Sequence, residues 1–417
     1  MQSFQAIPSS LVKFTQPFND LFSHNQYLHF QQYLSGLIMG EDKNILKISQ
    51  FIDHCSTYDN LHHFISNSHW NWQDITDKMV EVIKNDKYLK PIHTGWLVVD
   101  DVLIDKTGKK IEMVGKFFDY SENKYINYAH CLVQLWYVDT RSIGYPLTME
   151  MYIKESLLDD KSKFKTKHLI AKELVQWAIN KGLDFQGVLF DSWYLNKDFV
   201  DFIEENEKSW LSRIKSDRLI RHQGRLISVA DYQNLLTVND FKKVELKGRQ
   251  FRVHSKCFPV KSLTNRQVRL VFVQEYDKKK KQWTKTAVLA TNQITWHTDK
   301  ILKNYLLRWS IEVFFRDSKQ HLGLGSYQMR KLKGIKRHWC LVSLAYVFLV
   351  KVRLTSTLLN KLSHQLKTVG QLCSYYKDQM IEMLIHFAYR QFQDNKTPTE
   401  IIQTLKLDSP LLAGIEL

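Results

Sequence analysis

This chain of 417 residues contains little proline, glycine or cysteine, with 7, 15 and 5 residues respectively. It has no low-complexity linker, and 44% of its residues are hydrophobic, so it can bury a large core and should form two to four domains. Its cysteines are scattered singly, which predicts neither a disulfide framework nor a zinc site. A reducing compartment, the cytoplasm, is therefore expected.

The sequence also lacks a long hydrophobic run. Its most apolar stretch, residues 341–350, is too short to span a bilayer and is followed by Lys351 and Arg353. A buried core helix is the better interpretation. The first residues have neither the basic start nor the apolar run of a signal peptide. These features predict a soluble protein without a membrane partner.

Acidic residues are outnumbered, at 43 against 59 lysines and arginines, which gives a formal net charge of +16. A field of this sign favours a polyanionic partner. The basic residues are spread along the chain rather than gathered in a tail, so the charge belongs to the folded protein.

Two apolar runs end in aspartate. Residues 96–100 end at Asp100, which Asp101 follows, and residues 187–191 end at Asp191. Each pattern predicts a short buried strand with the acid at its C-terminal end. One such aspartate is usually a cap or turn residue. Hard divalent cations, however, require several convergent carboxylates, so two of them are candidate metal ligands.

A third acid lies in an apolar helical segment that also carries other functional groups. These polar residues are Tyr305, Arg308, Glu312 and Lys319. At about 100° per residue they fall on one stripe of a helix. A carboxylate flanked by two cations suits a metal ion beside a phosphate backbone. A solvated stripe with i,i+4 ion pairs is the alternative. The order Asp100, Asp191, Glu312 favours the metal site.

These residues resemble a known family, the DDE transposases of bacterial insertion sequences with the Tyr-x2-Arg-x3-Glu-x6-Lys signature. The resemblance covers about residues 96–353 and includes the segment 191–194, Asp-Ser-Trp-Tyr, which is similar to the family's Asp-Ser-x-Tyr. It implies that the three acids are catalytic and bind two Mg²⁺ (or Mn²⁺) ions. Val102 stands where the family often has threonine, which leaves Asp101 as an alternative to Asp100.

The resemblance implies an enzyme that cuts and rejoins double-stranded DNA at the terminal inverted repeats of its element and then attacks target DNA. It implies hydrolysis, transesterification, a hairpin intermediate and a homodimer in the synaptic complex. Tyr305 and Arg308 would hold a phosphate near an extruded base, and Lys319 would contact a neighbouring DNA strand. The aromatic candidates for stacking on that base are Trp283, Trp296 and Trp309, each of which could instead pack in the core.

Two other functions remain open. A DNA-binding regulator derived from a transposase would hold the ends without cutting, and loss of one acid would mark it. A ribonuclease H-like repair or junction nuclease would keep the acids. It would not account for the complete four-residue signature.

The order of patterns predicts an α/β protein. Its ribonuclease H-like catalytic core is interrupted by a β-rich insertion and flanked by helical N- and C-terminal domains. Strands at 96–100, 111–118 and 130–137 should form an antiparallel meander, and a helix at 167–181 should lead to a strand at 185–190 parallel to the first. The expected ranges are a helical DNA-binding domain (1–90), the first part of the core (91–210), the insertion (211–295), the second part of the core (296–355) and a helical region for possible self-association (356–417).

Within the insertion, residues 244–253 predict a hairpin that turns at Gly248. A second hairpin should join 268–276 to 283–291 through the lysines at 278–281. This basic turn fits either a DNA contact or a means of keeping the protein soluble.

Smaller features are less specific. Residues 43–52 fit either a helix-turn-helix on DNA or a plain packing helix. His54, His62 and His63 lack matching metal-ligand spacing and are expected to be ordinary polar or core residues. Apolar spacing predicts C-terminal helices at 358–362 and 380–385.

Overall fold

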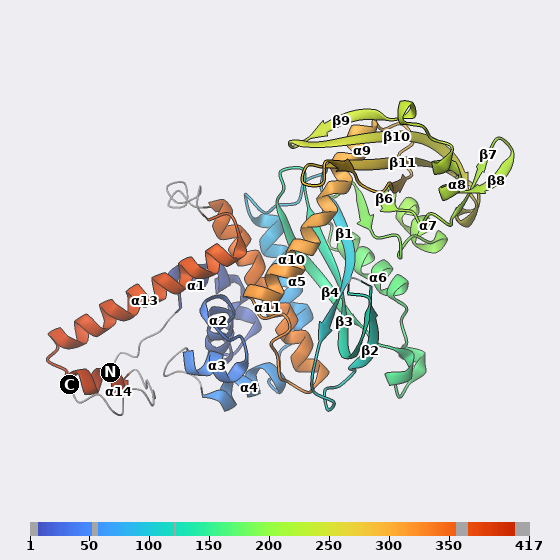
Figure 1. Cartoon of the computed structure of the whole chain (residues 1–417). Coiled ribbons are helices and arrows are strands. Elements are labelled where there is room, and N and C mark those ends of the chain that lie inside the picture. Colours follow the sequence, from blue (N-terminus) through green and yellow to red (C-terminus); the bar gives the residue numbers. More distant parts are fainter. Residues whose placement is uncertain (1–6, 52–56, 121, 356–365, 405–417) are drawn as a thin grey trace. The chain divides into compact units, whose positions relative to one another are not determined.

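The computed structural model describes residues 7–51, 57–120, 122–355 and 366–404 (Figure 1). The helices are α1 (Ser9–Thr15), α2 (His24–Met39), α3 (Ile45–Phe51), α4 (Tyr58–Ser66), α5 (Trp72–Asn85), α6 (Lys167–Asn180), α7 (Lys197–Glu205), α8 (Val229–Asn234), α9 (Thr298–Tyr305), α10 (Trp309–His321), α11 (Leu332–Thr355), α13 (Val369–Gln393) and α14 (Pro398–Thr404). The strands are β1 (Trp96–Asp105), β2 (Gly115–Asp119), β3 (Lys124–Val138), β4 (Gly144–Tyr152), β5 (Gly187–Phe190), β6 (Ser209–Arg213), β7 (Leu219–His222), β8 (Arg225–Ser228), β9 (Lys242–Leu246), β10 (Arg249–Val260), β11 (Arg266–Asp277), β12 (Gln282–Trp283) and β13 (Ala287–Thr291).

The chain divides into two compact units. Unit 1 comprises Met1–Lys90, Leu103–His130 and Phe314–Leu417, and unit 2 comprises Pro91–Val102 and Cys131–Val313. The α/β class expected from the sequence is confirmed, because helices and a large mixed sheet occur together. The five expected ranges divide the chain differently and stay a prediction.

Unit 1 contains the most apolar helix, α11. Its residues from Trp339 to Val350 are all buried, as expected for a core helix. Among the described helices, α11 alone has the length and apolarity to cross a bilayer, and 72% of its apolar window is buried. A core helix passes the same test, so α11 is not evidence of a membrane.

A buried polar network in unit 1 joins α11 to α2. His338 Nε2 donates to the Gly323 carbonyl at 2.8 Å, so Nδ1 is the unprotonated nitrogen and accepts from the Tyr33 hydroxyl at 2.8 Å. A parallel arrangement has His130 donating to the Glu112 carbonyl and accepting from Tyr327. Burial lowers the pKa of His338 to about 4, so the neutral imidazole is built into the fold.

Unit 2 is organised by a mixed sheet with the strand order β3-β1-β5-β6-β13-β11-β10-β7-β8. β5 is parallel to both β1 and β6, as the sequence predicts for β1. The predicted helix before β5 is α6, whose Thr166 side chain caps its first turn. It ends where Gly182 takes a φ of +62° and the chain turns toward β5.

The strands of the expected insertion extend this same sheet, because β13 pairs antiparallel with β6. Both predicted hairpins are confirmed (Figure 1). β9 and β10 turn at Lys247 and Gly248, whose positive φ values of 51° and 72° suit a tight two-residue hairpin. In the second hairpin Tyr276 pairs with Trp283.

The expected antiparallel meander is wrong, because β3 lies between β2 and β1 in the sheet, whereas a meander would place β2 beside β1. The bounds of these strands also differ from the sequence-based expectation, and β3 begins at Lys124 rather than 130. β1 continues five residues beyond Asp100, to Asp105, and the second strand begins at Gly115 rather than 111. A fourth strand, β4, pairs with β3 and was not predicted. It contains Pro146, which a strand accommodates at a sheet edge and which weakens the sequence pattern.

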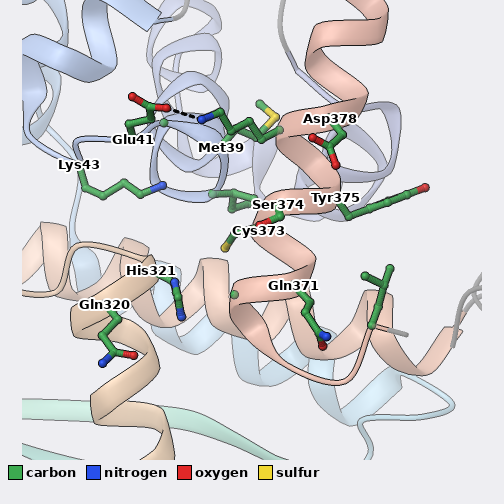
Figure 2. A pocket seen from close by; sticks show the side chains of 15 residues that line it. Met39, Glu41, Lys43, Gln320, His321, Gln371, Cys373, Ser374, Tyr375 and Asp378 are labelled. Atoms are coloured by element: carbon green, nitrogen blue, oxygen red, sulfur yellow. Dashed lines mark hydrogen bonds and ion pairs between the residues drawn. The ribbon is translucent and has the colours of Figure 1, made fainter. Parts of the chain in front are cut away.

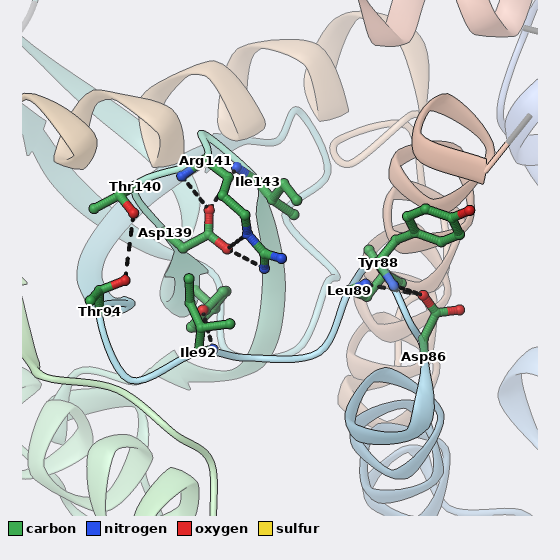
Figure 3. A network of polar contacts seen from close by, with 10 residues as sticks. Asp86, Tyr88, Leu89, Ile92, Thr94, Asp139, Thr140, Arg141 and Ile143 are labelled. Atoms are coloured by element: carbon green, nitrogen blue, oxygen red, sulfur yellow. Dashed lines mark hydrogen bonds and ion pairs between the residues drawn. The ribbon is translucent and has the colours of Figure 1, made fainter. Parts of the chain in front are cut away.

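The turn between β3 and β4 is fixed by a buried carboxylate, shown in Figure 3. Asp139 accepts from the Arg141 guanidinium Nε at 2.8 Å and from two backbone N–H groups, those of Arg141 and Ile143. These bonds satisfy an acid that is fully shielded from solvent.

The remaining small features have mixed outcomes. His54, Cys55 and the expected helix at 358–362 lie outside the described residues, whereas residues 380–385 are helical within α13. The ring of His63 hydrogen-bonds Ser68 at 3.1 Å. The free thiols among the described residues are those of Cys131, Cys257, Cys340 and Cys373.

Acidification should destabilise this fold through His338. Its pKa is about 4 in the folded chain against 6.5 ordinarily, so the stability it contributes is complete above pH 6.5 and is lost as pH falls through 4. We expect a loss of about 3 kcal/mol. Urea unfolding at several pH values should show a shallower pH dependence for His338→Gln, whereas the exposed His69→Gln should keep the wild-type dependence. Identical curves for His338→Gln and wild type would contradict this.

Candidate active site

The pairing of β1 with β5 brings two aspartates of unit 2 to the same level of the sheet. Val99 is the register partner of Phe190, so Asp100 and Asp191 follow at adjacent positions on neighbouring parallel strands. Asp191 comes directly after the end of β5. Asp100 lies within β1, so the expectation that its strand ends at this acid is wrong. The strand continues because Val102 to Ile104 are again half-buried or buried.

Arg308 links the first aspartate to the helical glutamate. Its Nη1 lies 2.6 Å from Asp100 Oδ2, and its Nη2 lies 2.5 Å from Glu312 Oε1. Only 14% of the Arg308 side chain is exposed. Each end of the planar guanidinium therefore donates a charge-assisted hydrogen bond to a different carboxylate.

The expected single helix through Tyr305 and Lys319 is interrupted. α9 ends at Tyr305, the 3-10 helix η6 (Leu306–Arg308) follows, and α10 begins at Trp309. Sequence periodicity did not reveal this break, because three residues per turn and 3.6 residues per turn differ little over one turn. Arg308 is the last residue of the tighter turn and Glu312 lies in the first turn of α10.

Burial is the largest influence on the ionisation of Asp100 and Arg308. The pKa of Asp100 is raised to about 7, mainly by burial and to a smaller extent by the charges of Asp101 and Asp191, against the opposing effect of Arg308. Burial alone would lower the pKa of Arg308, but Asp100 and other nearby groups raise it above its usual value. Arg308 thus offsets only part of the cost of burying a charged carboxylate at Asp100.

Tyr305 belongs to the same cluster. Burial raises the pKa of its phenol, while the charges of Arg308 and Arg213 and a hydrogen bond with Arg308 lower it. The structure thus brings together Asp100, Asp191, Tyr305, Arg308 and Glu312. Arg213, on β6, was missed by the sequence analysis because no motif includes it.

Asp101 points to the other face of β1, since successive side chains of a strand alternate. Its Oδ1 accepts from the Tyr194 hydroxyl at 2.8 Å and its Oδ2 pairs with Lys167 Nζ at 2.7 Å. The Cys131 thiol also donates to Oδ2, at 3.4 Å. Burial raises the pKa of Tyr194 well above its usual value, so its hydroxyl stays a donor. Asp101 is thus held by β3, α6 and the loop after β5.

Lys167 and Tyr194 are further residues that sequence reasoning missed as supports of the site. Tyr194 had a signal, because it ends the Asp-Ser-Trp-Tyr segment that follows β5. Lys167 had none, since it is one of many lysines and only folding brings α6 to Asp101.

The predicted DNA-contact residues occupy different environments. Trp283 packs against Tyr276 and the Arg252 guanidinium. Trp296 packs edge-on against Trp96. Trp309 is 63% exposed.

Lys319 lies on α10 but in unit 1, where its Nζ donates to the Leu103 carbonyl at 2.9 Å.

The donor set fits a hard divalent cation. Asp100, Asp191 and Glu312 offer only carboxylate oxygens, which Mg²⁺ and Mn²⁺ prefer. Between Asp100 and Glu312, however, stands the Arg308 guanidinium. Among the described residues no three His, Cys, Asp or Glu side chains lie close enough to share a metal ion. The three acids thus have oxygen ligands of the kind that hard cations bind, and two of them, Asp100 and Glu312, pair with Arg308.

A separate cavity of about 700 Å³ lies in unit 1, between α2, α10 and α13 (Figure 2). Lys43 extends into it and is 8% exposed, and burial lowers its pKa to about 8. The cavity is lined by two acids, Glu41 and Asp378, and by Lys377 in addition to Lys43. Its charge is therefore mixed and favours neither anions nor cations. Lys43 is thus not a surface contact of the helix-turn-helix considered above.

A carboxylate cluster on a mixed α/β sheet is typical of metal-dependent enzymes that cut phosphodiester bonds. The family described as DDE superfamily endonuclease matches residues 17–234, more than half of the chain, and the Transposase DDE domain matches residues 165–348. The chain belongs to the DDE superfamily of endonucleases.

A curated relative is similar to part of the chain. The probable transposase for insertion sequence element IS701 of Microchaete diplosiphon is 26% identical over 167 residues, 38% of this chain. The match spans 41% of that relative's length. Among solved structures, the NurA nuclease from Sulfolobus solfataricus is 12% identical, with 61% of this chain and 85% of that chain covered and a TM-score of 0.26. A TM-score that low is not evidence of a shared fold.

Removing Asp101 should destabilise the protein. Asp101→Ala leaves the largely buried Lys167 ammonium without its carboxylate, and we expect a loss of about 2 kcal/mol in the free energy of unfolding. Urea denaturation measures this. Lys167→Met in the Asp101→Ala background should restore part of the loss, and Asp105→Ala, at the exposed end of β1, should change little. Equal stability of Asp101→Ala and wild type would exclude this role.

Proposed function

We propose that this endonuclease is the transposase of a bacterial insertion sequence, which cuts and rejoins double-stranded DNA at the terminal inverted repeats of its element. The observation that carries this proposal is the grouping of Asp100 with Asp191, Glu312 and Arg308. Membership of the DDE superfamily and the similarity to the IS701 protein support it. A ribonuclease H-like layout for the strands around Asp100 is part of the proposal.

In this proposal Asp100, Asp191 and Glu312 hold two divalent cations, Mg²⁺ or Mn²⁺. When bound, such a pair activates the attacking oxygen and stabilises the leaving oxygen. Asp101 is not a ligand in this proposal, because it points to the opposite face of β1 from Asp100, where Lys167 and Tyr194 engage its two oxygens. Its role is to hold the strand that carries Asp100.

The other residues bind and orient DNA. Arg308 presents a fork of N–H groups that can pair with two phosphate oxygens, and the Tyr305 phenol lies beside it. Trp309 is the best candidate for stacking on an extruded base, because it is well exposed and adjoins Arg308. Lys319 contacts a neighbouring strand of the DNA. The reaction is cut-and-paste through a hairpin intermediate.

The proposed partners are the element's terminal repeats and target DNA, met in the cytoplasm. The net charge of +16 favours such a polyanion. The lysine turn at 278–281 lies along the DNA backbone in this proposal. Its Lys279 and Lys280 backbone N–H groups bind Asp277, which orders the turn. Two copies form the synaptic complex, because two DNA ends require two active sites.

Replacing any of the three proposed metal ligands should greatly slow cleavage. Glu312→Gln, Asp100→Asn and Asp191→Asn should each slow nicking by about 1,000-fold, since metal-ion catalysis contributes several kcal/mol. DNA carrying the sequences that flank the gene is incubated with each protein and Mg²⁺ or EDTA, and DNA binding is measured in parallel. Glu205→Gln, an exposed glutamate of α7, is the matched control and should cut normally.

The same experiment separates the alternatives. Metal-dependent cuts at the element's ends that vanish in the Glu312→Gln protein support the transposase. Binding without any cut would replace it with a DNA-binding regulator. Cutting that ignores the ends would indicate a general nuclease.

Trp309→Ala should weaken the engagement of an extruded base. Stacking contributes about 1–3 kcal/mol for each base, so a step that needs it should slow about tenfold or more. The fluorescence of 2-aminopurine placed near the cleaved end reports base extrusion. Trp309→Phe keeps an aromatic ring and should retain most of the signal. Unchanged fluorescence and rate in Trp309→Ala would rule out this residue.

A further inference from the structure

The Arg308 guanidinium lies between the carboxylates of Asp100 and Glu312 and hydrogen-bonds both. One end donates to Asp100 Oδ2 at 2.6 Å and the other to Glu312 Oε1 at 2.5 Å. Its side chain is only 14% exposed, and those of Asp100 and Glu312 are 18% and 33% exposed. A single shielded cation thus bridges two carboxylates that come from a strand and a helix.

We infer that Arg308 makes metal binding depend on DNA: in the DNA-free chain it fills the cation position between Asp100 and Glu312, and a DNA phosphate draws it away. This inference rests on the proposed function, because it takes Asp100 and Glu312 to be metal ligands. It assigns Arg308 a second role, in specificity, beyond contacting phosphate.

The competition follows from the oxygens involved. Asp100 Oδ2 and Glu312 Oε1 each accept a short hydrogen bond from Arg308, so a divalent cation at these oxygens must displace the guanidinium. A displaced guanidinium without another anion would leave a buried, unpaired charge, which is strongly unfavourable. Divalent cations therefore compete poorly for these oxygens while Arg308 has no phosphate to pair with.

DNA supplies that other partner. A phosphodiester offers two oxygens in a geometry that the planar fork of arginine matches as well as it matches a carboxylate. Transfer of Arg308 from the acids to a phosphate exchanges one ion pair for another and frees both carboxylates. The acids are then ready for metal only when a DNA backbone lies beside them.

As a consequence, metal binding becomes selective for the DNA-bound protein. If the metal-competent arrangement is about 1–10% populated without DNA, the apparent affinity for metal falls by the same factor, about 10- to 100-fold. The DNA-free protein then holds its metal site closed, and cleavage begins only at a backbone that has engaged Arg308.

The test measures metal binding rather than cutting. Mn²⁺ is titrated into the full-length protein, and free Mn²⁺ is followed by electron paramagnetic resonance, with and without double-stranded DNA carrying the sequences that flank the gene. Wild type should bind Mn²⁺ at least about tenfold more weakly without DNA than with it. Arg308→Gln should bind Mn²⁺ without DNA about as tightly as wild type does with DNA.

Matched variants guard against misfolding. Arg316→Gln removes an exposed arginine from α10 and should behave as wild type. Arg308→Lys keeps one positive charge but lacks the fork, so its DNA-free affinity should lie between those of wild type and Arg308→Gln. Circular dichroism and thermal unfolding confirm that each variant is folded.

Two failures are distinguishable. Equal Mn²⁺ affinity of wild type and folded Arg308→Gln without DNA overturns the inference, and so does a wild-type affinity that DNA leaves unchanged. If Glu312→Gln binds Mn²⁺ as tightly as wild type in the presence of DNA, the proposed metal site itself is wrong. Weak binding by Glu312→Gln together with tight, DNA-independent binding by wild type would retain the site and remove only the role of Arg308.

Discussion

The parallel pairing of β1 with β5 is the constraint on which the rest of the site depends. Its register sets Asp100 level with Asp191, although 90 residues of chain separate them. The pairing is stabilised by apolar side chains that are almost completely buried in both strands. The packing of these strands thus places two carboxylates side by side, and the burial of Asp100 creates a need for a cationic partner.

That need is met differently on the two faces of β1. Asp101 pairs with Lys167 and accepts a hydrogen bond from Tyr194, and these contacts stabilise the fold. Asp100 shares Arg308 with Glu312, and burial keeps its pKa raised to about 7 despite the opposing charge of Arg308. Asp100 and Asp101 therefore have different roles, because successive side chains of a strand point to opposite faces of the sheet.

Local chemistry made much of the fold predictable. The hairpin at Gly248, the helix before β5 and the parallel pairing of β5 followed from turn residues and hydrophobic periodicity. The extension of β1, the 3-10 turn at Leu306–Arg308 and strand β4 did not follow. Each of these depends on what the segment packs against, and a window of sequence contains no such information.

The sequence by itself determined which functional groups are present. These are three acids in the order Asp, Asp, Glu, an arginine four residues before the glutamate, and a large excess of basic residues. The sequence left open which of Asp100 and Asp101 faces the cluster and what Arg308 contacts. Only the tertiary structure decided these, because Lys167 and Arg308 reach their carboxylates from 66 and 208 residues away along the chain. Spacing in sequence encodes neighbours on one helix or strand, whereas the partners of a buried charge are chosen by the packing of the whole unit.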